Sequence, residues 1–211
     1  MASYVEVAMD PIVVIGASAG GLEPLRRFIA ALPVPCTASV FVVMHIGCHP
    51  STLPYLLGRA GLPAAFAQDG ALIEAGHIYV APPDHHMLLE PDRIRLSQGP
   101  KVHYTRPAAD PLFASAAQAH GKRIIGIVLS GWGSDGASGL WAIKKHGGTA
   151  LAQHPADATV PLMPCAAIAT NNLDDCLPIQ EIAQRVGALC TPRPKNGARV
   201  IPPRDTPDRL G

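Results

Sequence analysis

The sequence predicts a single α/β domain built on a parallel β-sheet. Three short apolar runs, at residues 12–15, 39–44 and 124–129, are rich in β-branched side chains and stop abruptly at glycine, histidine or small residues. Runs of this length and composition are typical of strands that are buried on both faces. Apolar residues at helical spacing follow them further along the chain, so the pattern indicates strands alternating with helices.

Composition supports one domain and excludes several classes of partner. The 211 residues are 48% hydrophobic, which suits a domain over residues 11–190 with a lead-in at 1–10 and a flexible Pro/Arg-rich tail at 191–211. The 17 basic and 16 acidic residues give a formal net charge of +1, so no field attracts nucleic acid or an anionic membrane. The apolar runs are too short to insert into a membrane, and no signal segment is present, which predicts a cytoplasmic protein.

The five cysteines are spread along the chain, odd in number and without a Cys-x-x-Cys pair. This usage is typical of reduced thiols in the cytosol rather than of a disulfide framework or a zinc site. Most of them are expected to pack as small hydrophobic residues.

The first strand runs into Gly16-Ala17-Ser18-Ala19-Gly20-Gly21, and a helix is predicted to follow because Leu22, Leu25 and Ile29 recur at helical spacing. Three interpretations of this turn remain open. It matches the Gly-x-Ser-x-Gly nucleophile elbow, in which a sharp strand-to-helix turn exposes a serine. It also resembles a dinucleotide loop in which Ser18 replaces the middle glycine, or it is a plain turn that packs closely.

The second strand, 39–44, ends at His45. In open α/β sheets ligands bind beyond the carboxyl ends of the strands, so His45 and Ser18 are predicted to lie at the same edge if their strands are parallel neighbours. A loop histidine bonded to the backbone is the alternative. A metal site with His49 is disfavoured because Gly47 and Pro50 prevent the helix that would align the two rings.

A helix capped by Ser51 is expected over 53–57, followed by short strands at 77–83 and 93–97 that suggest an antiparallel lobe at the sheet edge. Between these strands lies Asp84-His85-His86. Neighbouring side chains in a strand point to opposite faces, so a local hydrogen-bond cluster is favoured over a metal site.

Asp110 is predicted to cap a helix that has Pro111 at its first position and ends at Gly121. Just upstream, Arg106 is either a residue at the rim of a site or a surface arginine paired with Asp110. After the third strand, Asp135 precedes a helix with Leu140 and Ile143, and its simplest role is to cap that helix. A strand at 149–153 and helices at 165–169 and 179–189 complete the predicted domain.

Ser18, His45 and Asp135 each follow a strand and supply the hydroxyl, imidazole and carboxylate of a nucleophilic triad. Serine needs a base to remove its proton, and a buried carboxylate fixes the tautomer of that base and stabilises the imidazolium. The order Ser, His, Asp differs from the Ser, Asp, His order of the α/β-hydrolases, so that superfamily fits poorly.

With these residues placed, the chain resembles the catalytic domain of the CheB-type chemotaxis protein-glutamate methylesterases over residues 11–189. The segments that carry the resemblance are 13–21, 42–45, 76–83, 106–107, 129–137 and 163–164. It implies a doubly wound, Rossmann-like, mostly parallel sheet with helices on both faces.

The resemblance also implies the chemistry. Ser18 would be the nucleophile, His45 the general base and then acid, and Asp135 its orienting carboxylate, acting on glutamate γ-methyl esters of chemoreceptor cytoplasmic domains. Some family members also deamidate receptor glutamines. A methyltransferase acting on the same glutamates would be the counterpart enzyme, and no cofactor or metal is implied. Candidates for the oxyanion hole or substrate pocket are Ala19, Gly20, Trp132, Gly133 and Arg106.

The chain departs from the family pattern at three positions. Ala19 stands where threonine is usual, Met44 where glutamine is usual and Trp132 where methionine is usual, which affects the expected substrate choice more than the chemistry. The receiver domain that commonly precedes this catalytic domain is missing, so a stand-alone esterase or a domain cut from a longer protein is expected. The alternatives are a non-catalytic module that binds a receptor or signalling partner, and a dinucleotide-binding domain.

Overall fold

The computed structural model describes residues 10–46, 48–59 and 61–190. The predicted tail at 191–211 lies outside the described residues, as does the lead-in at 1–10 apart from Asp10. No helix in the described part of the chain is both long enough and apolar enough to cross a bilayer.

A seven-stranded sheet in the order β3-β4-β2-β1-β7-β8-β9 forms the centre of the fold, and every strand pair in it is parallel. Its strands are β1 (Ile12–Ala17), β2 (Ser39–Met44), β3 (Ala64–Phe66), β4 (Ile78–Val80), β7 (Ile124–Val128), β8 (Thr149–Gln153) and β9 (Asp175–Leu177). The predicted parallel sheet is therefore confirmed.

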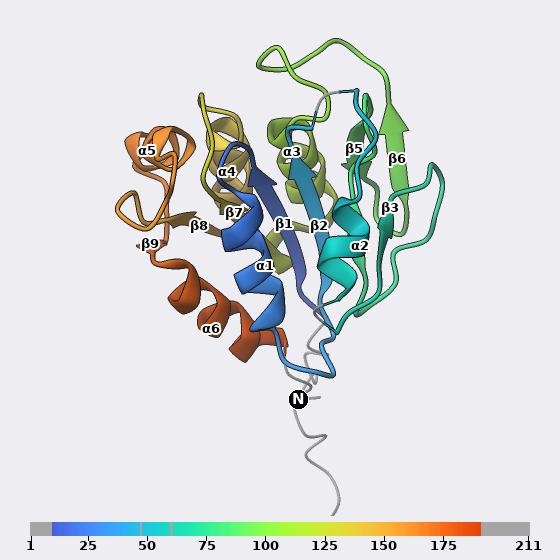
Figure 1. The fold of residues 1–211 in the computed structure, drawn as a ribbon, viewed down its shortest axis with the longest axis horizontal. Helices are drawn as coiled ribbons and strands as arrows, with labels where there is room; N and C mark the ends of the chain where they lie inside the picture. The colour runs from blue at the N-terminus through green and yellow to red at the C-terminus, as the bar shows by residue number, and fades with distance from the viewer. Residues whose placement is uncertain (1–9, 47, 60, 191–211) are drawn as a thin grey trace, which may run out of the picture.

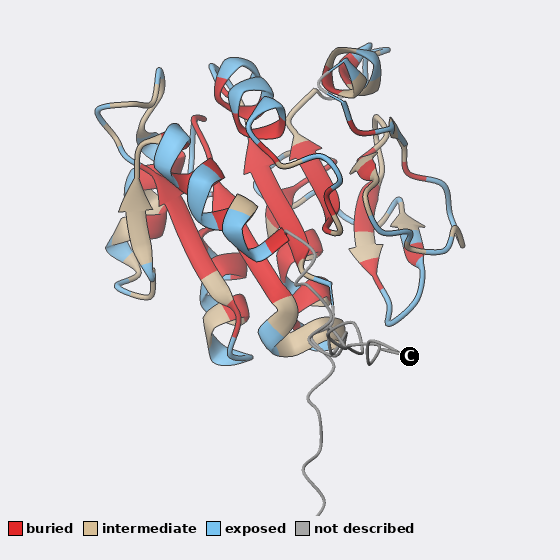
Figure 2. Cartoon of the chain, turned by 90° about the horizontal axis from the view of Figure 1, so that it is seen from below, coloured by how far each residue is buried: buried red, intermediate tan, exposed pale blue. Residues whose placement is uncertain are grey.

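Helices cover both faces of this sheet (Figure 1), as the sequence predicts. One face carries α1 (Leu22–Ala30), α2 (Leu53–Gly58) and α6 (Ile179–Cys190), and the other carries α3 (Ala109–His120), α4 (Ala137–Lys145) and α5 (Leu162–Ala169). The central strands β1, β2 and β7 are almost wholly buried between the helices, whereas the edge strands β3 and β9 are only partly buried (Figure 2).

Alternation along β1 divides the core into two clusters. Val13 and Ile15 point into the cluster with α1 and α6, whereas Ile12 and Val14 point into the cluster with α3 and α4. Both faces of the strand are apolar because both are covered, which is the pattern that marks a central parallel strand. Burying each such side chain contributes roughly 1.5–3 kcal/mol to folding.

A separate antiparallel pair, β5 (His86–Leu89) and β6 (Ile94–Ser97), confirms the predicted small lobe but corrects its membership. The segment expected to pair with β6, residues 77–83, instead supplies β4 to the parallel sheet. Ile78 and Val80 are fully buried there, next to β2, so joining the main sheet removes them from water.

The register of the central strands determines where the site lies. Ala17 at the end of β1 is opposite Met44 at the end of β2, and Gly16 is opposite Val128 at the end of β7. The three chain segments that follow these residues therefore emerge together at one edge of the sheet.

Candidate active site

Ser18 lies in a tight turn between β1 and α1 that is clamped by the loop after β7. Its N–H donates to the carbonyl of Ser130 at 2.9 Å, and its own carbonyl accepts the N–H of Gly21 at 3.0 Å. The hydroxyl of Ser130 donates to the carbonyl of Ala19 at 2.8 Å, which holds the next residue of the turn. Two backbone segments more than a hundred residues apart thus fix the position of Ser18.

Glycines are required where these two loops meet. A Cβ on Gly131 would lie 2.7 Å from the Cβ of Ser18, closer than side chains pack. Gly20 has φ +73°, and a Cβ there would lie 2.6 Å from the Cβ of Thr159. These contacts explain the small residues that the sequence places around the serine.

His45 directly follows β2, on the strand next to Ser18. Its N–H donates to the carbonyl of Ala17 at 3.1 Å, so it continues the pairing of β1 with β2 for one residue. Its side chain is largely buried, at 15% exposure, and Nε2 lies 2.7 Å from Oδ2 of Asp135. With Nε2 bonded to a carboxylate, Nδ1 is the ring nitrogen left to exchange a proton with a hydroxyl.

The structure thus joins two of the three predicted residues directly and places the third on the adjoining strand end. Within the described residues, the Ser18 hydroxyl forms no hydrogen bond with the His45 ring or any other side chain. Such contacts are often loose without substrate, so the free hydroxyl is compatible with a nucleophile.

Asp135 is 1% exposed and bonded through both oxygens. Besides His45, Oδ2 accepts the N–H of Ala109 at 2.6 Å, and Oδ1 accepts the N–H of Asp110 at 2.9 Å. Burial acts to raise the pKa of Asp135, but the hydrogen bonds from His45 and from these two N–H groups outweigh it and hold the pKa below its usual value. The lowered pKa favours the charged carboxylate, the form that pairs with a protonated imidazole.

This geometry corrects the simplest role considered for Asp135, a cap on its own helix. The N-cap residue of α4 is Gly136, at φ +92°, which has no side chain of its own to cap the helix. Asp135 instead binds the first turn of α3, where free N–H groups and the helix dipole stabilise an anion.

Asp110 makes the reciprocal contact, which the sequence did not reveal. Its Oδ1 accepts the N–H groups of Gly136 at 2.9 Å and Gly139 at 2.7 Å, so it serves the N-terminus of α4. Its Oδ2 lies 2.8 Å from Nε2 of His103. The prediction that Asp110 caps its own helix is wrong, because Ala108 holds the N-cap position of α3.

Burial raises the pKa of Asp110, and the nearby charge of Asp135 adds to this effect, while hydrogen bonds from His103 and Gly139 oppose it. The sequence signal for this exchange was an aspartate close to each of two helix starts. The positions of the two aspartates in the sequence do not indicate which of them binds the N-terminus of which helix.

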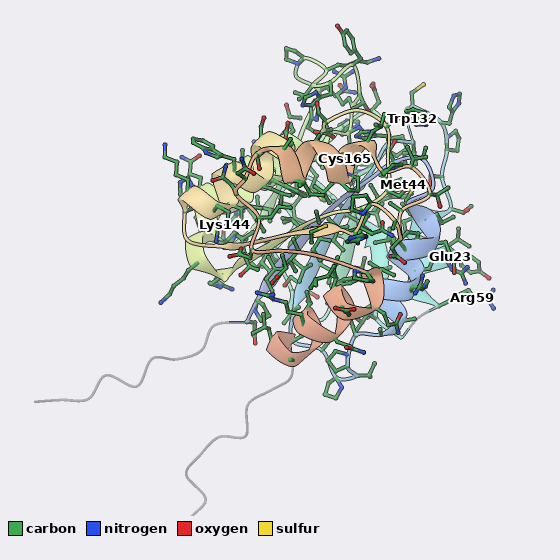
Figure 3. The ribbon with its side chains drawn as sticks, turned by 90° about the vertical axis from the view of Figure 1, so that its left-hand side faces the viewer. Glu23, Met44, Arg59, Trp132, Lys144 and Cys165 are labelled. Carbon is green, nitrogen blue, oxygen red and sulfur yellow. The ribbon has the colours of Figure 1, made fainter. Side chains whose placement is uncertain are left out.

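The predicted oxyanion candidates separate into two groups. No described acceptor takes the main-chain N–H groups of Ala19, Gly20, Trp132 or Gly133, and these four residues are exposed at the rim around Ser18. Trp132 has 63% of its surface exposed and lies on the same side of the molecule as Met44, which is half-buried (Figure 3).

Arg106 is used elsewhere. Nε and Nη2 donate to Oδ1 of Asp84 at 3.1 and 2.8 Å, and Nη1 donates to the carbonyls of Gln98 and Gly99, both at 2.7 Å. It pairs with Asp84 rather than with Asp110. Four of the five guanidinium N–H donors of Arg106 are thus used to brace this loop.

The Asp84-His85-His86 segment forms no common site. Nδ1 of His85 binds the carbonyl of Pro83, and the ring of His86 lies between the carbonyl of Pro100 and the N–H of Ala108. Asp110, Asp135 and His103 do approach one another within 4.8 Å. Three of their four carboxylate oxygens, however, accept main-chain N–H groups, and the fourth, Oδ2 of Asp110, pairs with the His103 ring, so the cluster is organised by hydrogen bonds.

Comparison with known proteins identifies a family that this chain matches. The family described as CheB methylesterase matches residues 13–186. A putative protein-glutamate methylesterase/protein-glutamine glutaminase of Leptospira interrogans is 35% identical over 175 residues, which cover 82% of this chain and 91% of that protein. A protein-glutamate methylesterase/protein-glutamine glutaminase of Caulobacter vibrioides is 39% identical over 183 residues, covering 83% of this chain and 53% of that protein.

A solved structure from the same family has the same fold. The crystal structure of the Thermotoga maritima CheB methylesterase catalytic domain superposes with a TM-score of 0.81 at 31% identity, covering 86% of this chain and 99% of that one.

Proposed function

The chain belongs to the CheB methylesterase family, and we propose that it hydrolyses glutamate γ-methyl esters on the cytoplasmic domains of chemoreceptors. The observation that carries the chemistry is the 2.7 Å contact between His45 and a buried, charged Asp135, at the strand end next to Ser18. A hydroxyl, an imidazole and a carboxylate at one sheet edge are the parts that acyl transfer requires.

In the first step the Ser18 oxygen attacks the ester carbonyl, and its proton passes to Nδ1 of His45. Asp135 stabilises the resulting imidazolium through Nε2. The free N–H groups around Ala19 and Trp132 would receive the negative charge of the tetrahedral intermediate. Collapse of this intermediate breaks the bond to the methoxy group, and the proton on His45 leaves with it as methanol.

In the second step water replaces methanol. His45 takes a proton from the water, and the water oxygen attacks the acyl-serine. The bond to Ser18 then breaks, the proton on His45 passes to the Ser18 oxygen, and glutamate is released. The balance is ester plus water giving carboxylate, methanol and one proton. The same sequence applied to a glutamine side chain releases ammonia, which would make deamidation a second activity of this site.

In the cell this reaction would reverse the work of a methyltransferase on the same glutamates and so contribute to chemosensory adaptation. The neutral site loses a methyl group and gains a negative charge. A change of one charge for each modified residue is the signal that the receptor would carry.

Methanol release from a methyl-esterified receptor fragment tests the proposal. Wild type should release methanol with time, whereas Ser18→Ala and His45→Ala should each lower kcat by roughly 10³-fold or more. Ser134→Ala is a matched control, because it removes an exposed hydroxyl from the loop that carries Asp135. This control should keep wild-type activity.

Two outcomes would reject the assignment. Equal release by wild type and Ser18→Ala would remove the serine from the mechanism. Tight binding of the receptor fragment without hydrolysis by wild type would instead support the non-catalytic binding module.

A further inference from the structure

A groove lined by arginines separates α1 from α2 on the face of the sheet that also carries α6. Its volume is about 350 Å³, and its wall includes Arg26 and Arg27 from α1, Arg59 at the end of α2, Glu23, and the apolar floor residue Leu57. We call it the arginine groove. Nothing in the mechanism proposed above uses these side chains.

The arginine groove contains more positively charged side chains than negatively charged ones. Glu23 and Arg26 form an exposed pair at 3.1 Å, which leaves two guanidinium groups. Arg27 donates only to the neutral amide of Gln180, at 3.5 Å, and its charge acts on the Asp157 carboxylate without a direct ion pair. Arg59 forms neither an ion pair nor a side-chain hydrogen bond within the described residues. The whole chain has a formal net charge of only +1, so this excess is local.

The groove also begins close to the catalytic edge. Helix α1 starts at Leu22, four residues after Ser18, and Arg26 lies about 6 Å further along its axis. Helix α2 comes from the segment that follows His45. Figure 1 shows the two helices side by side in front of the central strands. In Figure 3, Glu23 and Arg59 lie on the same side of the molecule as Met44 and Trp132, with Glu23 nearer to them and Arg59 further down.

We infer that the arginine groove binds an acidic stretch of the protein substrate that flanks the modified glutamate. This inference rests on the proposed function. Hydrolysis of an ester or an amide leaves a carboxylate, so a segment with several modifiable glutamates becomes more negative as it is processed. Guanidinium groups pair with carboxylates through paired N–H donors, and exposed positive charges also speed the encounter with an acidic partner.

The groove is a binding feature, so its loss should affect KM and not kcat. The test uses two helical peptides, each with one glutamate γ-methyl ester, flanked by four glutamates in one peptide and four serines in the other. In the double variant Arg27→Glu/Arg59→Glu, KM for the acidic peptide should rise roughly tenfold, with KM for the serine peptide and both kcat values unchanged. Added salt should shrink the difference between the peptides in wild type.

Arg93→Glu/Arg95→Glu is the matched control, because it reverses the same number of charges at the β5–β6 hairpin. It should leave KM for both peptides within twofold of wild type. An equal rise of KM in the control, or no rise in the groove variant, would overturn the inference.

A measurement of peptide binding distinguishes failure of this inference from failure of the proposed function. Fluorescence anisotropy of the labelled acidic peptide is measured on Ser18→Ala, with and without the two groove substitutions. A roughly tenfold weaker Kd upon substitution supports the groove even if wild type hydrolyses neither peptide. Equal Kd values reject the groove even if hydrolysis is normal.

Discussion

The carboxylate of Asp135 lies 2.7 Å from Nε2 of His45 and accepts hydrogen bonds from the N–H groups at the start of α3 at 2.6 and 2.9 Å. One buried carboxylate therefore connects the imidazole to a helix terminus. The residue that orients the histidine is thereby held by main-chain groups, which have little freedom to move. The ring of His45 is positioned by the scaffold before substrate arrives.

Asp135→Asn should therefore impair both activity and folding. An amide has one acceptor oxygen for three donors, so it would orient His45 poorly and leave a buried N–H unpaired. We expect kcat for ester hydrolysis to fall about 10³–10⁴-fold and the free energy of unfolding to fall by about 1–3 kcal/mol. Asp174→Asn, which alters a carboxylate bonded to Lys144 and Ala150, is the control and should leave kcat unchanged.

Asp110→Ala should lower kcat without touching the reacting groups. It frees the N–H groups of Gly136 and Gly139, so the segment after Asp135 loses its anchor. We expect about 1–3 kcal/mol less stability and a reduced kcat with KM unchanged. Asp110→Asn keeps an acceptor oxygen, so its stability and its kcat should both stay close to those of wild type. Additive effects of Asp110→Ala and Asp135→Ala in a double-mutant cycle would contradict coupling between the two carboxylates.

Gly131→Ala should displace Ser18, the proposed nucleophile. The new methyl group would collide with the Ser18 Cβ at 2.7 Å and with the side chain of Met163. Hydrolysis should fall by at least tenfold, together with thermal stability. Gly70→Ala provides the comparison, since Gly70 has φ +77° but open space around it. Gly70→Ala should lose about 1 kcal/mol of stability and keep full activity. If Gly131→Ala also kept full activity, the close approach of its methyl group to Ser18 would be tolerated.

Trp132→Ala should alter substrate binding and leave stability within about 0.5 kcal/mol, because the indole is 63% exposed. We expect KM for a protein substrate to rise severalfold, with little change for a small ester. Trp141→Ala removes another exposed indole, on α4, and should change neither KM. Steady-state kinetics with both substrates decide the matter, and identical KM values for Trp132→Ala and wild type would exclude a docking role.

Asp157 predicts a pH dependence of stability. Burial acts to raise its pKa, but hydrogen bonds from Ile179 and Gln153 and the charge of Arg27 together hold the pKa below its usual value. A depressed folded-state pKa stabilises the fold above the unfolded pKa, near 3.9, and this contribution is lost as the pH falls through the folded value.

Asp157→Ala should therefore lower the free energy of unfolding by about 0.5–1 kcal/mol at pH 7, a modest loss because the group is only partly shielded from solvent. Urea titrations at pH 7 and below pH 3.5 should show this difference shrinking in acid. Glu181→Ala, which removes an exposed acid from the first turn of α6, should show no such trend. A difference that is constant with pH would place the effect elsewhere.

Much of the fold was predictable because it depends on local patterns. Apolar β-branched runs identified β1, β2 and β7, and helical spacing identified α1 and α4. Strands of three residues gave weaker signals, so β3 and β9 were not anticipated and β4 was assigned to the wrong sheet. Short strands carry too few side chains for alternation to show which sheet they join.

The sequence by itself determined which residue types stand at the ends of the strands, and so which chemistry was available at Ser18, His45 and Asp135. Only the tertiary structure decided that His45 and Asp135, ninety residues apart, lie in contact, and that Asp135 and Asp110 each serve the other's helix. Strand order and register bring these segments together, and both are set by packing between distant parts of the chain, which no local spacing encodes.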